Sequence, residues 1–357
     1  MTGDCKGLQI ESARTNLLLQ SNNMSVSPWT TNSATGSVTP NALLSPDGTI
    51  TANLLSDTDS TNIKYWDQIV SVPNNSATYA QSVYLKQGTA QSSALIIYIL
   101  GGTTPLAADT YTEVNWSDMS VVSNCGGKVE NVGGGWYRLD VQITNNNSGN
   151  TQLYTRVLPA GLLGGGSRSG NVYAWGNQSE TGLFPSSYMP TTTAQVTRAA
   201  DFAYLDGVNL TSWYRQTEGT VLIKGTLAAR PSIVEQELFV LSDLTINNRV
   251  YAAVFSDGLL NTLAVSAGNQ QYISQKSTTA LPREFRCSVG IKSGEFASSF
   301  NGEAVQSNPS ALIPATPVTQ MTIGAFFNGI AQIDGWISQL SYYPKRLSNN
   351  QLQALSA

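Results

Sequence analysis

The sequence predicts an all-β protein of two β-sandwich (jelly-roll) domains in tandem, with a short carboxyl-terminal helix. Short runs of alternating residues recur along the chain, each bounded by Gly, Pro, Asn, Asp or Ser, which is the pattern of sandwiches and barrels. The apolar spacing of helices is nearly absent. The chain has 357 residues, more than one small core needs, so two domains are expected.

The predicted strands of the first half are separated by polar loops such as Asn145–Asn150 and the glycine-rich Gly161–Gly170. After them, Tyr188–Thr193 contains a proline and is expected to be an extended connector. We therefore place a jelly roll at residues 1–194 and a second sandwich at residues 195–357. The predicted strands of the first domain are Ile50–Leu55, Ile63–Val72, Tyr79–Lys86, Ala94–Leu100, Trp136–Thr144, Gln152–Leu158 and Asn171–Gln178.

The second half continues with the same alternation. Asn301-Gly302 predicts a tight type I′ hairpin between Phe300 and a strand at Glu303–Val305. The segment Ser348–Ala357 is the best candidate for a helix, because Ser348 can cap it and two leucines follow on one face. The other predicted strands are Gly219–Leu227, Glu237–Leu241, Val250–Ser256, Leu263–Ala267, Phe285–Lys292, Glu295–Phe300, Met321–Gly324 and Gly335–Tyr343.

The composition is poor in charge. Charged residues make up 12% of the chain, about half of the usual ~25%, and Ser, Thr, Asn and Gly take their place. Such a surface suits an extracellular or virion protein and hydroxyl-rich ligands, although all-β proteins also use these residues in strands and turns. The net charge is −4 without a Lys/Arg cluster, so nucleic-acid binding is not expected. No apolar run is long enough for membrane insertion, and Met1–Lys6 lacks the pattern of a signal peptide.

The chain contains no histidine, which excludes a Ser-His-Asp triad, a Cys-His pair and an imidazole metal ligand. Any catalysis would rest on carboxylates, Tyr, Lys or Arg. Glu235 and Glu237 are expected on one strand face, an arrangement loosely similar to the alternating acids of concanavalin-like glycosidases. Because Leu238, Phe239 and Val240 follow in place of another acid, we expect no enzyme and no catalytic residues.

Metal binding has little support in the sequence. The cysteines are odd in number and scattered, which fits neither a disulfide framework nor a zinc site and predicts buried free thiols: Cys5, Cys125 and Cys287. No metal site is assigned and no cofactor is expected. Whether a structural calcium ion is bound stays open, because no loop has a diagnostic ligand spacing. Its conceivable ligands are Asp47, Asp67 and Asp334.

Several segments of the first half together resemble a known family. Trp175–Gly182 reads W-G-N-Q-S-E-T-G and opens the closing strand and exit linker, Asn171–Asp201. The ordered set resembles the carbohydrate-binding-module-like jelly rolls of bacteriophage tail and head-fibre proteins, and implies a galactose-binding-like jelly roll related to carbohydrate-binding modules of families four and nine. Its other members are Gly7–Ser21, Pro28–Trp29, Pro46–Leu55, Tyr79–Lys86 and Gly135–Leu139.

The second half resembles another family of sandwiches. Ile333–Leu355 is similar to the last strand and short helix of concanavalin-A-like or laminin-G-like domains, and Glu218–Ile223 and Phe300–Val305 are similar to the opening and the middle of such domains. Phage structural proteins often place the two modules in this order. The resemblance implies a virion protein on the outer surface of a phage particle, with homo-oligomers, trimers among them, by analogy with phage fibres.

Carbohydrate modules bind sugars by stacking aromatic rings on them and through planar hydrogen bonds from Asn, Gln, Asp and Arg side chains. An aromatic side chain also loses little entropy on binding. Tyr65 and Trp66 are adjacent and must point to opposite faces of a strand, so at most one faces a core. The first choice for a sugar platform is Trp66. The full set of candidate carbohydrate-binding residues is Trp66, Asp67, Gln68, Trp29, Trp116 and Tyr65.

The function expected from the sequence is that of a phage virion structural protein, a fibre, spike or decoration component, that binds host surface glycans without cleaving them. Its expected partners are bacterial surface polysaccharide, other virion proteins and further copies of itself. Two alternatives remain open: a purely architectural virion protein that binds no glycan, and a polysaccharide-degrading enzyme, which the lack of histidine disfavours.

Overall fold

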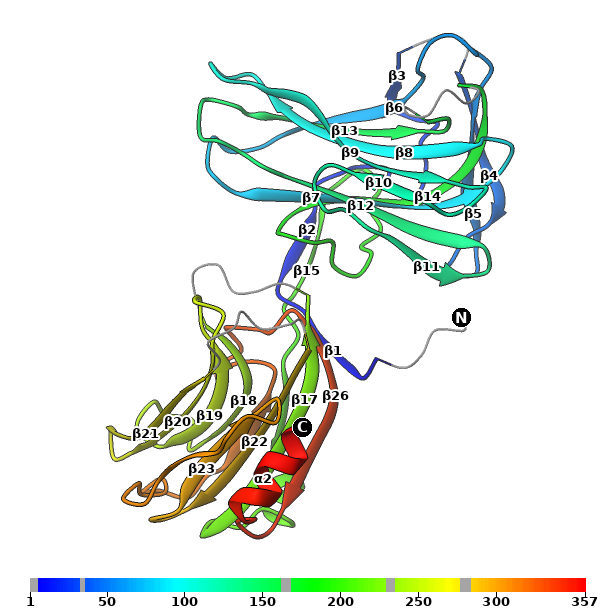
Figure 1. Cartoon of the computed structure of the whole chain (residues 1–357). Helices are drawn as coiled ribbons and strands as arrows, with labels where there is room; N and C mark the ends of the chain where they lie inside the picture. Colours follow the sequence, from blue (N-terminus) through cyan, green and yellow to red (C-terminus); the bar gives the residue numbers. More distant parts are fainter. Residues whose placement is uncertain (1–5, 33–35, 162–167, 229–234, 277–283) are drawn as a thin grey trace. The chain divides into compact units, whose positions relative to one another are not determined.

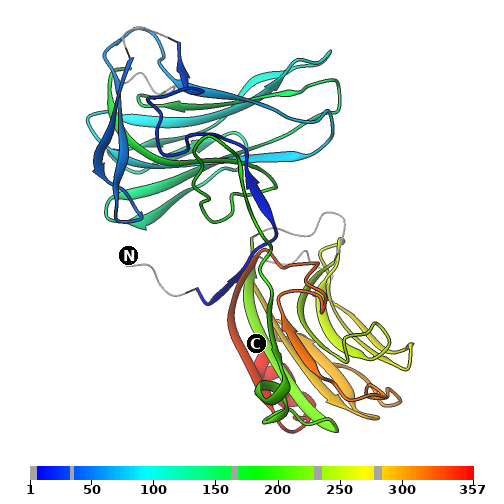
Figure 2. The same ribbon diagram turned by 180° about the vertical axis from the view of Figure 1, so that it is seen from behind.

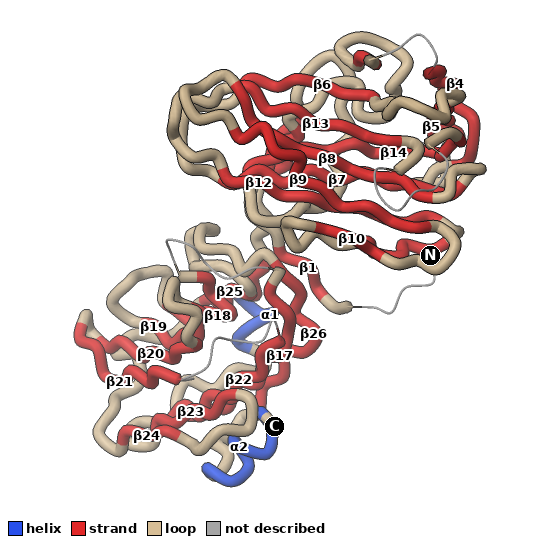
Figure 3. Tube along the Cα trace, turned by 45° about the horizontal axis from the view of Figure 1, so that its top comes forward, coloured by secondary structure: helices blue, strands red, loops and turns tan. Residues whose placement is uncertain are grey.

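The structure, a computed structural model, describes residues 6–32, 36–161, 168–228, 235–276 and 284–357. The chain divides into two compact units. The first sandwich comprises Arg14–Arg198, and the second sandwich comprises Cys5–Ala13 together with Ala199–Ala357. Both consist of antiparallel sheets, and strands predominate in both (Figure 3), so the predicted all-β class is confirmed. Among the described residues no helix has the length and hydropathy that crossing a membrane requires.

The first sandwich contains two six-stranded antiparallel sheets. The first, named here the β8 sheet, has the order β10 (Val121–Ser123), β9 (Leu106–Asn115), β8 (Ser92–Leu100), β13 (Gln152–Leu158), β6 (Trp66–Ser71) and β3 (Thr30–Thr31). The second, the β7 sheet, has the order β11 (Val129–Gly133), β12 (Trp136–Thr144), β7 (Thr78–Gln87), β14 (Gly170–Thr181), β5 (Ile50–Asp57) and β4 (Gly36–Leu44). Figure 1 shows the two sheets as layers.

The core of the first sandwich follows from strand alternation. Leu95, Ile97 and Ile99 of β8 point to one side of their sheet, and Val83 and Leu85 of β7 meet them from the facing sheet. All five are fully buried. Because successive side chains of a strand point to opposite faces, the residues between them on β8 lie on the outer face of the sheet. This arrangement positions the candidate site described below.

The second sandwich also contains two six-stranded sheets. The β17 sheet has the order β1 (Leu8–Ile10), β26 (Gly335–Tyr343), β17 (Glu218–Leu227), β22 (Glu284–Lys292), β23 (Phe296–Phe300) and β24 (Gln306–Asn308). The β19 sheet has the order β16 (Ala203–Asp206), β25 (Gln320–Ile323), β18 (Gln236–Ser242), β19 (Arg249–Val254), β20 (Leu260–Ser266) and β21 (Asn269–Lys276). Two short helices, α1 (Gly207–Thr211) and α2 (Asn349–Ser356), complete it. Helix α2 is the predicted one, with Ser348 as its cap and a capping box with Gln351.

The amino-terminal segment corrects the predicted domain division. The expected first domain, 1–194, included this segment, but β1 pairs with β26 and is a strand of the second sandwich. The first sandwich begins with β2 (Arg14–Asn16), which pairs with β15 (Val196–Arg198) beside the exit of the chain (Figures 1 and 2). The units therefore divide at Arg198 instead of residue 194. Local sequence does not reveal this, because long-range ladder pairing decides which sheet a three-residue strand joins.

Other expectations are modified in detail. Tyr188–Thr193, predicted as an extended connector, packs on the first sandwich: the Tyr188 hydroxyl lies 2.6 Å from Ser21 Oγ, and Thr191 Oγ1 donates to the Leu18 carbonyl. Asn301 and Gly302 both have positive φ, as a type I′ turn requires. The strand after that turn is β24, not Glu303–Val305. Cys287 is a buried free thiol and Cys125 is half-buried, while Cys5 lies outside the described residues.

Candidate functional site

The outer face of the β8 sheet carries a second, smaller hydrophobic cluster. Ala94, Ile96 and Tyr98 of β8 alternate with the core residues and point away from the core. Around them pack three further tyrosines, Tyr65, Tyr111 and Tyr154. The solvent side of an antiparallel sheet is usually polar, so an aromatic cluster there is unusual. We name this cluster, together with Asp67 and Arg156 described below, the tyrosine face.

Two of the tyrosines stack on each other. Tyr98 and Tyr154 are directly opposite across β8 and β13. Their ring centroids are 4.6 Å apart and the ring planes differ by 11°. Tyr98 is 6% exposed and Tyr154 is half-buried. Burial raises the pKa of the Tyr98 phenol, so this group stays neutral. The fixed, flat pair therefore presents the Tyr154 ring to solvent with little side-chain freedom left to lose.

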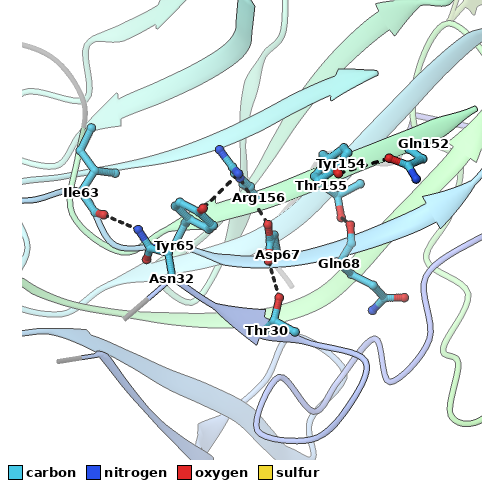
Figure 4. A network of polar contacts seen from close by, with 10 residues as sticks. All are labelled: Thr30, Asn32, Ile63, Tyr65, Asp67, Gln68, Gln152, Tyr154, Thr155 and Arg156. Atoms are coloured by element: carbon cyan, nitrogen blue, oxygen red, sulfur yellow. Dashed lines mark hydrogen bonds and ion pairs between the residues drawn. The ribbon is translucent and has the colours of Figure 1, made fainter. Parts of the chain in front are cut away.

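Arg156 is the charged centre of the tyrosine face, as Figure 4 shows. Its Cζ lies 3.8 Å from the Tyr65 ring centroid and 4.6 Å from that of Tyr98. Its Nη2 donates to the Tyr65 hydroxyl at 3.0 Å. Its Nε lies 3.4 Å from Asp67 Oδ2 in an ion pair. Among the described residues no hydrogen-bond partner is found for Nη1, which leaves this donor available to a ligand.

Asp67 is held in turn by its own neighbours. Thr30 Oγ1 donates to Asp67 Oδ1 at 2.6 Å, and the cross-strand register places Asp67 opposite both Thr30 and Arg156. The carboxylate and the guanidinium cancel each other's charge. The face therefore has a rigid planar donor next to flat aromatic rings, with no net charge between Arg156 and Asp67. Such a surface suits a ligand with hydroxyl groups and a flat apolar side.

The predicted tryptophan platform is wrong. Trp66 is 2% exposed and packs in the core between the sheets, because alternation along β6 turns it inward and turns Tyr65 and Asp67 outward. Trp29 and Trp116 are also buried in this core. Their indole N–H groups are satisfied inside the protein, by the Gln20 carbonyl at 3.0 Å and by Ser93 Oγ at 2.9 Å.

Of the remaining predicted residues, one is structural and two lie on the tyrosine face. Gln68 is buried, and its amide exchanges two hydrogen bonds with the Leu19 backbone, at 2.8 Å and 2.9 Å, so it is a structural residue. Tyr65 and Asp67 do lie on the tyrosine face. The sequence interpretation missed Tyr98, Tyr154 and Arg156. Both β8 and β13 were predicted as strands, and their alternation indicates which of their residues share a face. The register in which the two strands pair was not predicted, and this register brings the three residues together.

The aspartates considered for calcium have protein partners instead. Asp47 accepts hydrogen bonds from the Thr49 backbone and from Ser45 Oγ, and hydrogen bonds of this kind lower its pKa although burial opposes them. Asp334 accepts from the backbone and the hydroxyl of Ser12, both at 2.7 Å. Within the part of the chain that the structure describes, no group of three or more His, Cys, Asp or Glu residues that could hold a metal ion is found.

The acid pair of the second sandwich is not arranged as an open catalytic site. Glu237 is fully buried, and neither of its carboxylate oxygens has a hydrogen-bond partner among the described residues. Burial and the nearby Glu235 raise its pKa well above the ordinary value, against the opposing charge of Arg249. Burial also raises the pKa of Glu235. A general acid must reach its substrate, and the side chain of Glu237 is fully buried.

Comparison with known proteins gives weak likenesses only. No family model matches the chain, and no curated protein matches it. Among solved structures, the CBM40 module of the Ruminococcus gnavus IT-sialidase bound to α2,3-sialyllactose is 16% identical, with a TM-score of 0.36, over 43% of this chain and 92% of that one. The same module without that ligand is 15% identical, with a TM-score of 0.37, over 44% and 93%. A heptameric SAP-like pentraxin from Limulus polyphemus is 16% identical, with a TM-score of 0.29, over 39% and 70%. At these identities and scores the likeness carries no argument about function.

Proposed function

We propose that the first sandwich binds a carbohydrate on the tyrosine face and does not cleave it. The observation that carries this proposal is the stacked pair Tyr98 and Tyr154 beside an immobilised Arg156 on the outer side of the β8 sheet. An aromatic ring packs against the C–H side of a sugar ring, and a planar guanidinium donates to its hydroxyl oxygens. Both groups are already ordered, so little conformational entropy is lost on binding.

The ligand class follows from the charge of the face. Arg156 is neutralised by Asp67, and the acidic Asp109 and Glu113 lie on the neighbouring strand β9. A polyanion would gain little attraction there and would meet the exposed carboxylate of Asp109, whereas Glu113 is buried. We therefore propose a neutral, hydroxyl-rich glycan. Its affinity will depend only weakly on salt, because no net charge is neutralised on binding.

A glycan array of the full chain tests the proposal. Tyr154→Ala removes the exposed ring of the stack and is expected to weaken binding at least tenfold, while Tyr173→Ala, a half-buried tyrosine on β14 in the other sheet, serves as the matched control and leaves binding unchanged. Circular dichroism of both variants checks the fold. Equal binding by wild type and the Tyr154 variant, or no binding to any array glycan, contradicts the proposal.

Non-cleavage is part of the proposal. Most glycoside hydrolases use two carboxyl groups on either side of the bond they break. On the tyrosine face the carboxylate oxygens of Asp67 are already in contact with Arg156 and Thr30. Incubating the protein with a polysaccharide that it binds is expected to release no new reducing ends. Their appearance, at a rate that depends on protein concentration, would favour the enzyme alternative.

The biological setting is proposed on the sequence resemblance alone: a component of the outer surface of a phage particle that contacts bacterial surface polysaccharide, in many copies. Weak binding at each site then gives strong attachment through avidity. An antibody against this chain is expected to label intact purified phage particles. Labelling of disrupted particles only, or of none, speaks against a surface position.

A purely architectural role is the second candidate, and one surface patch favours it. In the second sandwich Phe202 and Tyr204 are 41% and 48% exposed, with ring centroids 5.1 Å apart, and Ile330 is 57% exposed. Exposed apolar groups of this kind are often covered by another protein. Retained particle incorporation in a variant that has lost glycan binding would show that the two roles are separable.

A further inference from the structure

A polar hollow lies in the second sandwich. The last strand of the β19 sheet, β21, and the last strand of the β17 sheet, β24, run close to each other at one edge of the sandwich (Figure 3). Between them is a cavity of about 630 Å³. A smaller one of about 270 Å³ adjoins it and shares Ser307, Asn308 and Pro309. The larger volume is within the range of about 300–1,000 Å³ typical of small-ligand sites.

The lining of the larger cavity is uncharged and rich in carboxamides. Gln270 and Gln271 come from β21, and Gln306 and Asn308 come from β24. A carboxamide carries a donor and an acceptor in one plane, which matches the paired donor and acceptor character of neighbouring sugar hydroxyls. The Asn308 carboxamide and the Gln271 amide nitrogen are bonded to the protein itself, to Gln271, Ser310 and Asn269. The described residues that line this cavity include neither Lys, Arg, Asp nor Glu. An anion would find no counter-charge there, so the chemistry favours a neutral ligand.

The floor of the cavity is fixed by hydrogen bonds across the two sheets. Tyr272 is 4% exposed, and its hydroxyl donates to the Gln306 carbonyl at 2.9 Å and lies 3.0 Å from Ser298 Oγ. Asn308 Nδ2 donates to the Gln271 carbonyl at 2.9 Å, and Asn308 Oδ1 accepts from the Ser310 backbone at 2.8 Å. The Tyr272–Gln306, Tyr272–Ser298 and Asn308–Gln271 bonds join β21 of one sheet to β23 and β24 of the other. The carboxamides therefore stand on a preorganised frame, which lowers the entropy cost of binding.

We propose that the β21–β24 edge is a second carbohydrate subsite, specific for neutral sugars and recognised by hydrogen bonds without aromatic stacking. It goes beyond the proposed function of the tyrosine face, because it lies in the other sandwich and uses other chemistry. A chain with two weak sites engages a repeating polysaccharide more strongly than either site alone. The charged groups of the smaller cavity, Arg346 and Glu295, do not enter the larger one.

The test uses the full chain with Tyr154→Ala, which removes the first site. The probes are neutral hexasaccharides of glucose, of galactose and of N-acetylglucosamine, and residual binding is followed by saturation-transfer NMR. Adding Gln270→Ala and Gln271→Ala is expected to weaken residual binding at least tenfold. The control is Gln339→Ala, at an exposed glutamine on β26 of the same sandwich whose side chain donates to Ser341, and it is expected to leave residual binding unchanged.

A variant that blocks the cavity controls for loss of binding through misfolding of the alanine variants. Ser307→Trp adds a large side chain at the rim shared by the two cavities and is expected to abolish residual binding with an unchanged circular dichroism spectrum. If Tyr154→Ala alone removes all binding, the subsite is refuted and the tyrosine face stands. If residual binding persists through both sets of edge variants, the subsite is also refuted. If the wild-type chain binds none of the hexasaccharides, both proposals fail for neutral sugars.

Discussion

At the residue scale, Glu237 gives the clearest prediction. Its folded-state pKa is raised by burial, so between the unfolded-state pKa of about 4.3 and the folded value the folded protein holds a proton that the unfolded chain has lost. The contribution of Glu237 to the free energy of unfolding is therefore full below about pH 4.3. It falls as pH rises through that window, by up to about 1.4 kcal/mol per pH unit. Glu237→Gln removes this loss.

Urea unfolding of wild type and Glu237→Gln between pH 4 and pH 8 measures the effect. The difference in unfolding free energy is expected to shift in favour of the variant as pH rises, even if a buried amide costs about 1–3 kcal/mol at every pH. Parallel stability curves for the two proteins would mean that the pKa of Glu237 in the folded protein is close to its value in the unfolded chain.

Residue roles were only partly predictable from the sequence. The opposite orientation of Tyr65 and Trp66 follows from alternation and is confirmed. Alternation does not tell which of the two residues points into the core, because either side of a strand can be the inner one until the facing sheet is known. The choice of Trp66 as platform was therefore wrong. Tyr98, Tyr154 and Arg156 become neighbours only through the β8–β13 register, which a single sequence does not state.

At the element scale, strand β1 gives a prediction of its own. Ile10 is 1% exposed and belongs to the core of the second sandwich, whereas Leu8, two residues earlier in the same strand, is 45% exposed. Ile10→Ala leaves a cavity and is expected to destabilise the second sandwich by about 2–5 kcal/mol. Leu8→Ala is the matched control and is expected to change stability by no more than about 0.5 kcal/mol.

Hydrogen-exchange mass spectrometry resolves this effect by domain. The Ile10 variant is expected to exchange faster in peptides of β17 and β26, the strand that β1 pairs with, while peptides of β7 and β8 keep their protection. Loss of protection in the first sandwich, or equal effects of Ile10→Ala and Leu8→Ala, would contradict the assignment of β1 to the second core.

Elements with strong alternation were predicted well. The bounds of β12 and β13 coincide with the predicted strands Trp136–Thr144 and Gln152–Leu158. Strand β9 was missed, because its sequence L-A-A-D-T-Y-T-E-V-N lacks a regular alternation of apolar and polar residues. Its ladder with β8 forms it nonetheless. Short strands such as β3 and β24 depend almost wholly on their partners and have little local signal.

At the scale of the whole molecule, the fold class followed from composition and periodicity, and the number of sandwiches followed from length. The assignment of the amino-terminal segment to the second sandwich could not be predicted from the sequence, since a segment that belongs to one sandwich and leads into the other has no sequence signature. The distribution of sites is a property of the same scale: one face rich in tyrosine and one edge rich in carboxamides, each in a different sandwich.

The central claim is that the tyrosine face binds a neutral glycan. A crystal structure of the full chain with the best-binding oligosaccharide from the array tests it most directly. The predicted result is a sugar ring in van der Waals contact with the Tyr154 ring and a sugar oxygen within hydrogen-bond distance of Arg156 Nη1. A sugar bound elsewhere on the chain, with the tyrosine face empty at saturating ligand, would contradict the claim.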